Sequence, residues 1–290
     1  MGGKYIDSPL NYIGGKYKLL PQIIPLFPKN INTFVDLFCG GCNVGINVNS
    51  EKVIFNDNLT FLIDLYVAFQ KTSEEEILRH IDKRIHEFNL SLTNKEGFLK
   101  LRETYNAEKN PLDLFVLIAY SFNHQIRFNS SHQYNNPFGK ERSSFNAKMK
   151  NNLLLFLEIL KTRSVEFYSK NFDEFDFSFL NQNDFVYADP PYLITTGTYN
   201  DGKRGFTGWN EDCENELLEL LNSLDKRGIK FALSNVMEHK GKSNDLLKAW
   251  TKKNNYTVNY MQKDYSNCNY QALNKSKTGT VEVLITNYKL

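Results

Sequence analysis

The stretch Asp184-Phe-Val-Tyr-Ala-Asp-Pro-Pro-Tyr192 decides the fold, because it joins a short apolar run directly to a polar corner that two prolines fix. Val, Phe and Tyr favour a β-strand over 184–188, and the prolines cannot continue it. Such an apolar run is typical of a strand buried on both faces of a parallel sheet. Because ligands bind beyond the carboxyl ends of such strands, we expect Asp189 and Tyr192 at a binding edge.

Outward from this stretch, six further segments are short and rich in β-branched or aromatic residues: 33–38, 52–55, 164–168, 229–233, 256–261 and 280–286. Helical periodicity occurs between several of them, at 212–226 and at 244–253. Strands that alternate with helices indicate a mainly parallel sheet with helices on both faces. The sequence therefore predicts an α/β fold with a seven-stranded, Rossmann-like sheet.

The alternation is interrupted over residues 61–161, where the pattern is mainly helical. Ser73 and Glu76 form a capping-box pattern, and Asn110 with Pro111 is typical of a helix start. Between Asn123 and Asn146 the periodicity fails, which predicts an exposed loop or ribbon. We expect one domain formed by residues 1–60 and 162–290, and an inserted, mainly helical domain at 61–161.

Composition excludes several classes of protein. With 41% hydrophobic and 23% charged residues, the 290-residue chain is neither wholly disordered nor collagen-like. No apolar run approaches the roughly 20 residues that a membrane-spanning helix needs, and Met1 to Leu10 lacks the apolar core of a signal peptide. Four cysteines without a secretion signal fit a reducing compartment. We therefore expect a cytoplasmic protein that does not bind membranes.

The turn after the strand at 33–38 has the sequence Asp36-Leu-Phe-Cys-Gly-Gly-Cys-Asn-Val-Gly45. It has neither the GxGxxG nor the GxxxxGK[ST] spacing that holds a pyrophosphate. Asp57 follows the next strand, where a carboxylate can accept hydrogen bonds from ribose hydroxyls. Together they suggest a nucleoside ligand without a pyrophosphate, such as S-adenosylmethionine. The structural alternatives are a tight turn at Gly40 and a helix cap at Asp57.

Asp189-Pro190-Pro191-Tyr192 can hold an exocyclic amine. The Asp189 carboxylate and the Pro190 carbonyl are two acceptors, which match the two N–H groups of an adenine N6. The Tyr192 ring offers a face on which a base could stack. The alternative is a rigid turn that only ends the strand.

These motifs, with Tyr12-Ile-Gly-Gly-Lys16, Asn56-Asp57, Ser234-Asn-Val236 and Val281 to Tyr288, resemble the Dam-type DNA adenine-N6 methyltransferases of the alpha arrangement, phage-encoded members above all. The resemblance spans nearly the whole chain. It implies transfer of a methyl group from S-adenosylmethionine directly to a flipped adenine in double-stranded DNA, with GATC as the target. In one departure, Cys42 stands where many relatives have the last glycine of FxGxG.

The resemblance also implies a role for individual residues. It makes Asp189, Pro190 and Tyr192 catalytic, and the cofactor-binding positions are Tyr12, Lys16, Asp36, Phe38, Gly40, Asp57 and Asp189. Residues 61–161 become the target-recognition domain. In it, the DNA-binding positions are Arg127, Asn129, Asn136, Pro137, Lys140 and Arg142.

Charge supports a local contact with a polyanion. The whole chain has a formal charge of only +2, but residues 121–150 contain five basic residues and one acidic residue, a local net charge of +4. Arginine can read guanine and asparagine can read adenine at base edges. We expect Arg127 and Arg142 to be the main readers, whereas Lys140, Lys148 and Lys150 suit phosphates. The alternative is a solvated loop that is basic by chance.

Three other interpretations stay open. The chain could be a non-catalytic DNA-binding regulator on the same fold, or a methyltransferase that acts on RNA or on a protein amide. The Cys39-Gly-Gly-Cys42 spacing could form a redox pair or half a zinc site, but Cys213 and Cys268 are isolated and no histidine cluster accompanies them. We expect no metal. We expect the protein in a bacterial or phage-infected bacterial cell. We expect it to be a monomer in solution, and more than one copy could bind to DNA.

Overall fold

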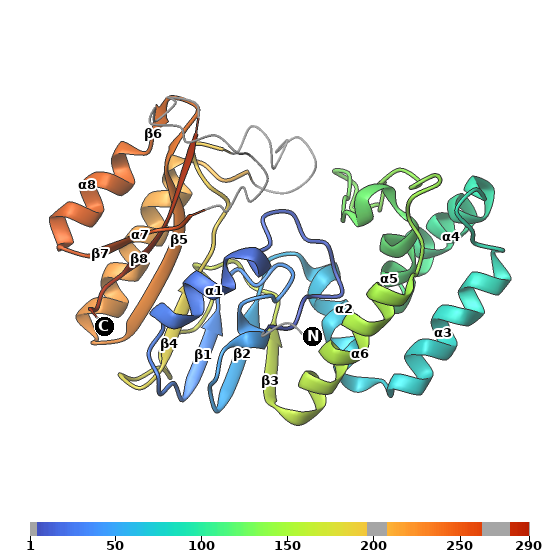
Figure 1. Ribbon diagram of the computed structural model, residues 1–290, viewed down its shortest axis with the longest axis horizontal. Coiled ribbons are helices and arrows are strands. Elements are labelled where there is room, and N and C mark those ends of the chain that lie inside the picture. The colour runs from blue at the N-terminus through green and yellow to red at the C-terminus, as the bar shows by residue number, and fades with distance from the viewer. Residues whose placement is uncertain (1–4, 196–207, 263–278, 290) are drawn as a thin grey trace, which may run out of the picture.

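The computed structural model describes residues 5–195, 208–262 and 279–289. Its sheet has the strand order β3-β2-β1-β4-β5-β8-β7, and the short β6 pairs with β5 alone (Figure 1). The strands are β1 (Thr33–Asp36), β2 (Lys52–Asn56), β3 (Ser164–Tyr168), β4 (Phe185–Ala188), β5 (Lys230–His239), β6 (Lys242–Ser243), β7 (Thr257–Tyr260) and β8 (Thr280–Thr286). The predicted α/β fold and its seven strands are confirmed. The two-residue β6 was not predicted.

The five strands from β3 to β5 are parallel, and β8 runs antiparallel to both β5 and β7. The carboxyl ends of β1, β2 and β4 therefore meet at one edge, and the segments that follow them carry Phe38, Asp57 and Asp189. This common edge is why motifs far apart in the sequence converge in space.

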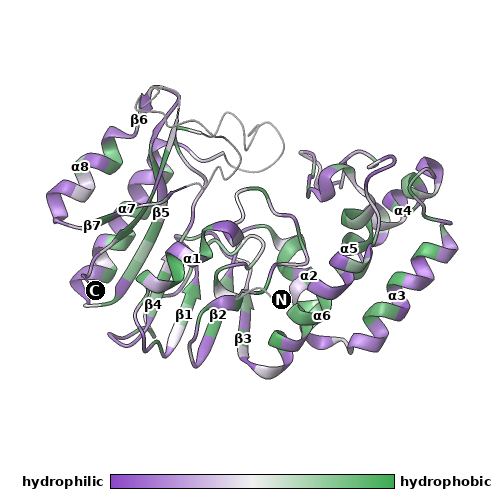
Figure 2. Cartoon of the chain, in the orientation of Figure 1, coloured by the Kyte–Doolittle hydropathy of each residue, from purple (hydrophilic) through white to green (hydrophobic). Residues whose placement is uncertain are grey.

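Helices cover both faces of the sheet. On β1 the neighbours Phe34 and Val35 are both fully buried but belong to different hydrophobic clusters, one on each face. Val35 packs in the cluster with α7 (Glu211–Lys226) and α8 (Asp245–Asn254), the two helices that the sequence predicted beside the later strands. In Figure 2, α8 is hydrophilic outward and hydrophobic along one side, as a helix on a sheet must be.

Between β2 and β3 the chain forms α2 (Thr60–Lys71), α3 (Glu74–Glu87), α4 (Lys95–Glu108), α5 (Pro111–Tyr120) and α6 (Ala147–Thr162), which lie to one side of the sheet in Figure 1. Both predicted helix starts are present: the Ser73–Glu76 capping box opens α3, and the Asn110 side chain caps α5 ahead of Pro111. Buried residues of these helices share one hydrophobic cluster with Phe34 and Phe55 of the sheet. The division into two domains at 61 and 161 stays a prediction.

Four-residue α1 (Leu20–Ile23) and the loop around it precede β1 and contribute Leu20 and Ile23 to the same cluster. Within the residues that the structure describes, no helix is long and apolar enough to cross a membrane.

Residues 122–142, which we call the 122–142 loop, have little regular structure beyond the three-residue 3₁₀ turn Phe122–His124. Two isolated β-bridges, Ser121 to Phe138 and Phe128 to Tyr134, hold the loop as an irregular ribbon. Asn106 of α4 binds the backbone of Tyr134 through both its amide nitrogen and its oxygen, at 3.0 and 2.7 Å. The ribbon predicted between Asn123 and Asn146 is confirmed, but it is not exposed throughout, because Phe128, Tyr134 and Asn136 within it are buried.

Candidate functional site

A cavity of about 390 Å³ lies beyond the carboxyl ends of β1, β2 and β4. A cavity of this size is in the usual range for a small-molecule site. Every position that the sequence predicted for the cofactor or for catalysis lines it: Tyr12, Lys16, Asp36, Phe38, Gly40, Asp57, Asp189, Pro190 and Tyr192. The structure thus brings four separate motifs together around one space.

The glycine turn forms the floor of this cavity. Gly40 has a φ of +45°, and a Cβ on it would come within 2.8 Å of the Tyr12 ring, so glycine is required there both for the backbone and for the contact. The Gly40 carbonyl accepts a 2.7 Å hydrogen bond from the buried Tyr66 hydroxyl. Cys42 has a φ of +61°, a left-handed conformation that favours glycine. Cys42 therefore adopts the left-handed backbone conformation that the glycine of FxGxG would adopt without strain, so the shape of the turn is preserved where the sequence departs from that motif.

Asp57 is not a helix cap, because α2 begins at Thr60 with Leu59 as its N-cap. Its Oδ2 accepts from Gly40 N at 3.0 Å, and its Oδ1 accepts from Leu59 N at 2.9 Å. Burial raises the pKa of the Asp57 carboxyl, and these two backbone hydrogen bonds oppose the rise. Each oxygen keeps a further lone pair, so the carboxylate can still accept from two ligand hydroxyls. These two remaining acceptor positions fit the hydroxyls of a ribose.

Asp189 lies at the centre of a cluster of charged and polar groups. Its Oδ2 is 2.6 Å from Lys16 Nζ, and its Oδ1 accepts from the Tyr192 hydroxyl at 3.1 Å. Burial raises the pKa of Asp189, whereas the Lys16 ammonium lowers it. Lys16 is itself only 5% exposed and also donates to the Gly14 carbonyl at 2.9 Å. The N-terminal motif therefore supplies the counter-ion of the carboxylate after β4.

Asp36 is the last residue of β1, and its Oδ2 accepts from Gly45 N at 3.1 Å. Burial, reinforced by the negative charges of Asp189 and Asp57, raises the pKa of Asp36 to about 8. Asp36 therefore holds the glycine turn in shape and carries a proton near neutral pH.

Sequence reasoning missed three aromatic or acidic groups at this site. Phe172 and Trp209 line the cavity and pack with Phe38, with ring centroids 5.6 and 5.7 Å from it. Glu214 accepts a 2.7 Å hydrogen bond from the Trp209 indole and so fixes that ring. Phe172 follows β3, and Trp209 lies between β4 and α7. Segments that follow parallel strands lie at the edge of the sheet where ligands bind, and this position was the signal available in the sequence.

Glu282 on β8 was also missed as a site residue, although the sequence resemblance includes its segment. It accepts from the Tyr192 hydroxyl at 3.1 Å and lies 3.8 Å from Lys16 Nζ. Its position 90 residues after Tyr192 gave no local signal.

The predicted DNA-binding residues occupy three different environments. Arg127 is half-buried and lines the cavity together with Ile126 and Phe128. Pro137, Lys140 and Arg142 are exposed, and the Arg142 guanidinium lies 5.0 Å from the centre of the Phe122 ring. The loop thus reaches from the cavity wall to the surface.

The two asparagines of the set hold the loop together. Asn136 is 2% exposed, and its amide nitrogen donates to the carbonyls of Phe122 and Gln125 at 3.1 and 2.9 Å. The structure therefore places Asn136 in the interior of the loop, where its amide nitrogen satisfies two backbone carbonyls. Asn129 Oδ1 accepts from the backbone N–H groups of Ser131 and Gln133. Its oxygen shapes a turn.

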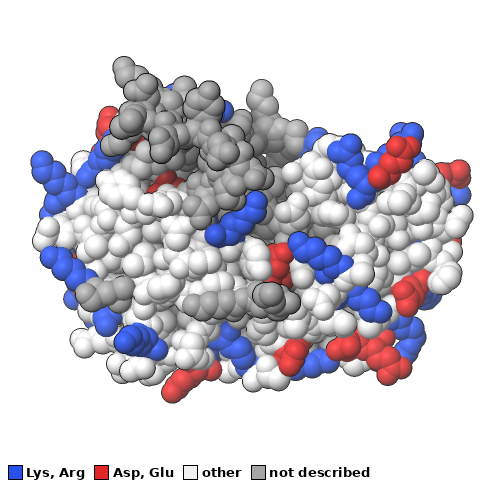
Figure 3. All heavy atoms as spheres, in the orientation of Figure 1, with Lys and Arg blue, Asp and Glu red and all other residues white. Residues whose placement is uncertain are grey.

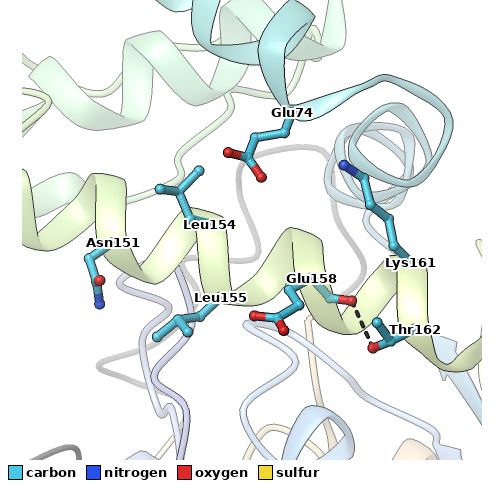
Figure 4. A pocket seen from close by; sticks show the side chains of 7 residues that line it. All are labelled: Glu74, Asn151, Leu154, Leu155, Glu158, Lys161 and Thr162. Carbon is cyan, nitrogen blue, oxygen red and sulfur yellow. Dashed lines mark hydrogen bonds between the residues drawn. The ribbon is translucent and has the colours of Figure 1, made fainter.

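Basic and acidic side chains are interspersed over the face in Figure 3, in keeping with the small net charge. A second hollow of about 290 Å³ lies along α6 near the start of α3 (Figure 4). It shares no lining residue with the first cavity. Among the described residues no group of three His, Cys, Asp or Glu side chains could hold a metal ion, and Cys39 and Cys42 are free thiols. Cys268 lies outside the described residues.

The mainly parallel sheet brings the glycine turn, the Asp57 carboxylate and the Asp189–Tyr192 corner around one cavity, which are the motifs on which the resemblance to adenine-N6 methyltransferases rests. The family model of the D12 class N6 adenine-specific DNA methyltransferases matches residues 12–268. The chain belongs to this family.

Two curated relatives are similar over almost the whole chain. The modification methylase StsI of Streptococcus sanguinis is 56% identical over 99% of the chain, and the type II methyltransferase M.FokI of Planomicrobium okeanokoites is 54% identical over 98%. The chain spans 43% of the length of each of them. The DNA adenine methylase of Escherichia coli K12 is 26% identical over 78% of the chain and 79% of its own length. The likeness to phage-encoded members stays a prediction.

Proposed function

We propose that the protein is a site-specific DNA adenine-N6 methyltransferase that uses S-adenosylmethionine. The observation that carries the proposal is the convergence of Asp57, Lys16 and the Asp189–Tyr192 corner on one cavity beside the 122–142 loop. S-adenosylmethionine supplies the methyl group on a sulfonium that adenine N6 can attack.

The residues of the cavity suit the two halves of this reaction. Asp57 accepts from the ribose hydroxyls, and the aromatic wall of Phe38, Phe172 and Trp209 offers faces for the cofactor adenine. Asp189 and the Pro190 carbonyl accept from the N–H groups of the target adenine. Because adenine N6 is inside the duplex in B-DNA, the base must flip into the cavity, which costs a few kcal/mol.

The 122–142 loop supplies sequence recognition in this proposal. Arg127 on the cavity wall and Arg142 on the surface can each hold a guanine edge, and Lys140 suits a phosphate. GATC remains the first target to test. It rests on the resemblance to DNA adenine methylases, of which the E. coli enzyme is 26% identical, whereas the modification methylases at 54 and 56% identity are closer guides to the recognition sequence.

The test is transfer of tritium from labelled S-adenosylmethionine to DNA that lacks N6-methyladenine, followed by mapping of the modified base. We expect label on adenine within one defined sequence. Comparison of plasmids that contain GATC with a library of random sequences identifies that sequence. Label on RNA or on protein, with none on DNA, would show that the substrate is not DNA and would refute the proposal.

A non-catalytic DNA-binding regulator on this fold is the second candidate, and it predicts specific DNA binding without any transfer. The buried Lys16–Asp189 pair argues against it, because a buried ion pair is costly to keep where no chemistry needs it. We place the protein in the cytoplasm of a bacterium, as a monomer that acts within a restriction-modification system.

A further inference from the structure

Glu214 is a fully buried carboxyl that accepts hydrogen bonds from three neutral side chains. It lies in the first turn of α7 and is not among the described residues that line the cavity. Its Oε2 accepts from the Trp209 indole at 2.7 Å, and its Oε1 accepts from the amide nitrogens of Asn235 and Asn244 at 2.8 and 3.4 Å. The carboxyl therefore joins a ring of the cavity wall to β5 and to the start of α8.

The backbone fixes the direction of both asparagine amides. Asn235 Oδ1 accepts from Val236 N at 2.7 Å, and Asn244 Oδ1 accepts from Leu247 N at 3.0 Å as the N-cap of α8. Because a backbone N–H can only donate, each amide must turn its oxygen to the backbone and its nitrogen to Glu214. An indole also can only donate through its nitrogen. A side chain that accepts with both of its terminal atoms is therefore needed at Glu214, and a carboxyl meets this need.

The segment Ser234-Asn-Val236, which is part of the sequence resemblance, supports the cavity wall from behind. Its serine hydroxyl is 2.8 Å from the hydroxyl of Tyr187, which lines the cavity. Its asparagine donates to Glu214, which accepts from Trp209. One short piece of β5 thus holds two aromatic rings of the wall, one directly and one through the buried carboxyl.

The position of Trp209 shows which part of the cavity this support serves. Its ring centroid is 5.7 Å from that of Phe38, which follows β1, and 5.5 Å from that of Phe172, which follows β3. Because β2 lies between these two strands, Trp209 is on the side of the cavity where Asp57 follows β2. Asp189 follows β4, on the other side of β1. The supported ring therefore belongs to the ribose end of the cavity.

We propose that Glu214 is a positioning residue for cofactor binding, which holds the Trp209 ring in the orientation on which the cofactor adenine stacks. The inference rests on the proposed function, because its ligand is the adenosine part of S-adenosylmethionine. Trp209 is half-buried, so part of its ring is open to a ligand. The indole N–H is the only polar group of the side chain, and its bond to Glu214 fixes the plane of the ring before the ligand arrives.

Glu214→Met is the decisive variant, because methionine is unbranched and of similar length but offers only a weak acceptor. Its matched control is Glu219→Met, which removes an exposed carboxyl from the same helix at a position that does not line the cavity. Trp209→Phe keeps an aromatic ring and removes the N–H. It replaces the decisive variant if thermal melting shows that Glu214→Met is unfolded.

The first readout is the motion of the indole and needs neither cofactor nor DNA. The chain has two tryptophans, and the other, Trp250, donates to Asn222 at 2.9 Å and serves as an internal reference. Time-resolved fluorescence anisotropy should show no fast local motion in the unmodified chain or in Glu219→Met, and a fast component in Glu214→Met. A Glu214→Met decay without this component would overturn the proposed anchoring of the ring.

The second readout is calorimetric binding of S-adenosylhomocysteine. We expect Glu214→Met and Trp209→Phe each to raise its Kd at least ~5-fold, and the double variant to bind no more weakly than the weaker single one, because both changes remove the same contact. Glu219→Met should bind within twofold of the unmodified chain, and every variant should bind DNA within threefold. A Kd for S-adenosylhomocysteine within twofold of normal in either Glu214→Met or Trp209→Phe would refute the proposal.

Tryptophan emission identifies the base that the ring contacts. S-adenosylhomocysteine should quench the part of the emission that Trp209→Phe lacks, and DNA alone should not. Quenching by DNA alone would assign the ring to the target base and overturn the proposal.

Methylation assays separate this inference from the proposed function. Glu214→Met should raise the KM for S-adenosylmethionine and keep kcat within threefold, whereas a lower kcat at an unchanged KM would overturn the positioning role. An unmodified chain that binds S-adenosylhomocysteine but transfers no methyl group would refute the proposed function alone, and the binding data would still support the role of Glu214. An unmodified chain that does not bind S-adenosylhomocysteine would refute both.

Discussion

Replacement of Asp57 by alanine tests the cofactor end of the cavity most directly. In the structure each carboxylate oxygen accepts one backbone N–H, from Leu59 and from Gly40, and has one lone pair left for a ribose hydroxyl. A hydrogen bond to a charged group contributes about 1.5 to 3 kcal/mol. Loss of even one such bond therefore predicts a Kd for S-adenosylmethionine that is about 10- to 160-fold higher. Asp57→Ala also removes the acceptor of the Gly40 N–H, which loosens the glycine turn and raises the Kd further.

Isothermal titration calorimetry with S-adenosylhomocysteine, which cannot react, measures this change. Asp173→Ala is the matched control, because Asp173 lines the same cavity but is exposed, so it reports the loss of a nearby negative charge alone. We expect its Kd to change by less than threefold. If Asp57→Ala also binds within threefold of normal while its thermal melting shows a folded protein, Asp57 does not hold the ribose.

Three further predictions concern the chemistry, the DNA and the pH dependence of stability. Asp189→Ala should lower turnover at saturating cofactor by about 10²-fold or more while a gel-shift assay still shows specific DNA binding; normal turnover would make Asp189 a turn residue only. Arg127→Ala should relax the preference at one base pair in competition assays, whereas Lys148→Ala, at an exposed position, should weaken binding to all sequences and flatten its salt dependence. Because the folded pKa of Asp36 is raised to about 8, the folded state binds the extra proton, so stability falls as pH rises from about 4 to 8. Asp36→Asn, which can still accept from Gly45, should remove up to about 1.4 kcal/mol per pH unit of that slope in denaturant unfolding, and an unchanged slope would contradict the shift.

The sheet and the helix starts were predictable because their signals are local. A run such as Phe185 to Ala188 is short, apolar and closed by prolines, and the Ser73–Glu76 box is read from four consecutive residues. The meeting of Asp57 and Asp189 followed from one rule about parallel strands, since the carboxyl ends of β2 and β4 share an edge with β1. Lys16 lies before the first strand, and only the resemblance implied its place at the site.

Other parts of the site depend on contacts that no local pattern encodes. Glu282 joins Tyr192 only because β8 runs antiparallel to β5, which positions its side chain behind the DPPY corner. Asparagine is a residue type that can read a base edge, so Asn136 was predicted to bind DNA. A loop without regular structure must also satisfy its own buried carbonyls, and the Asn136 side chain donates to those of Phe122 and Gln125. The left-handed Cys42 shows that a glycine motif can be relaxed where its neighbours still impose the turn.

The packing around α2 explains why the 122–142 loop and Asp57 border one cavity. This helix begins at Thr60, three residues after Asp57, so the acid and the helix start are placed together. Phe61 on its first turn stacks on Phe128 of the 122–142 loop, with ring centroids 4.6 Å apart, and Phe128 lines the cavity next to Arg127. The helices of residues 60–162 and one face of the sheet form a single buried cluster, and Phe128 and Tyr134 anchor the loop in it. A ligand that binds Asp57 therefore meets a loop that packing already holds against the cavity. In the proposed function, DNA brings its adenine to that preformed wall.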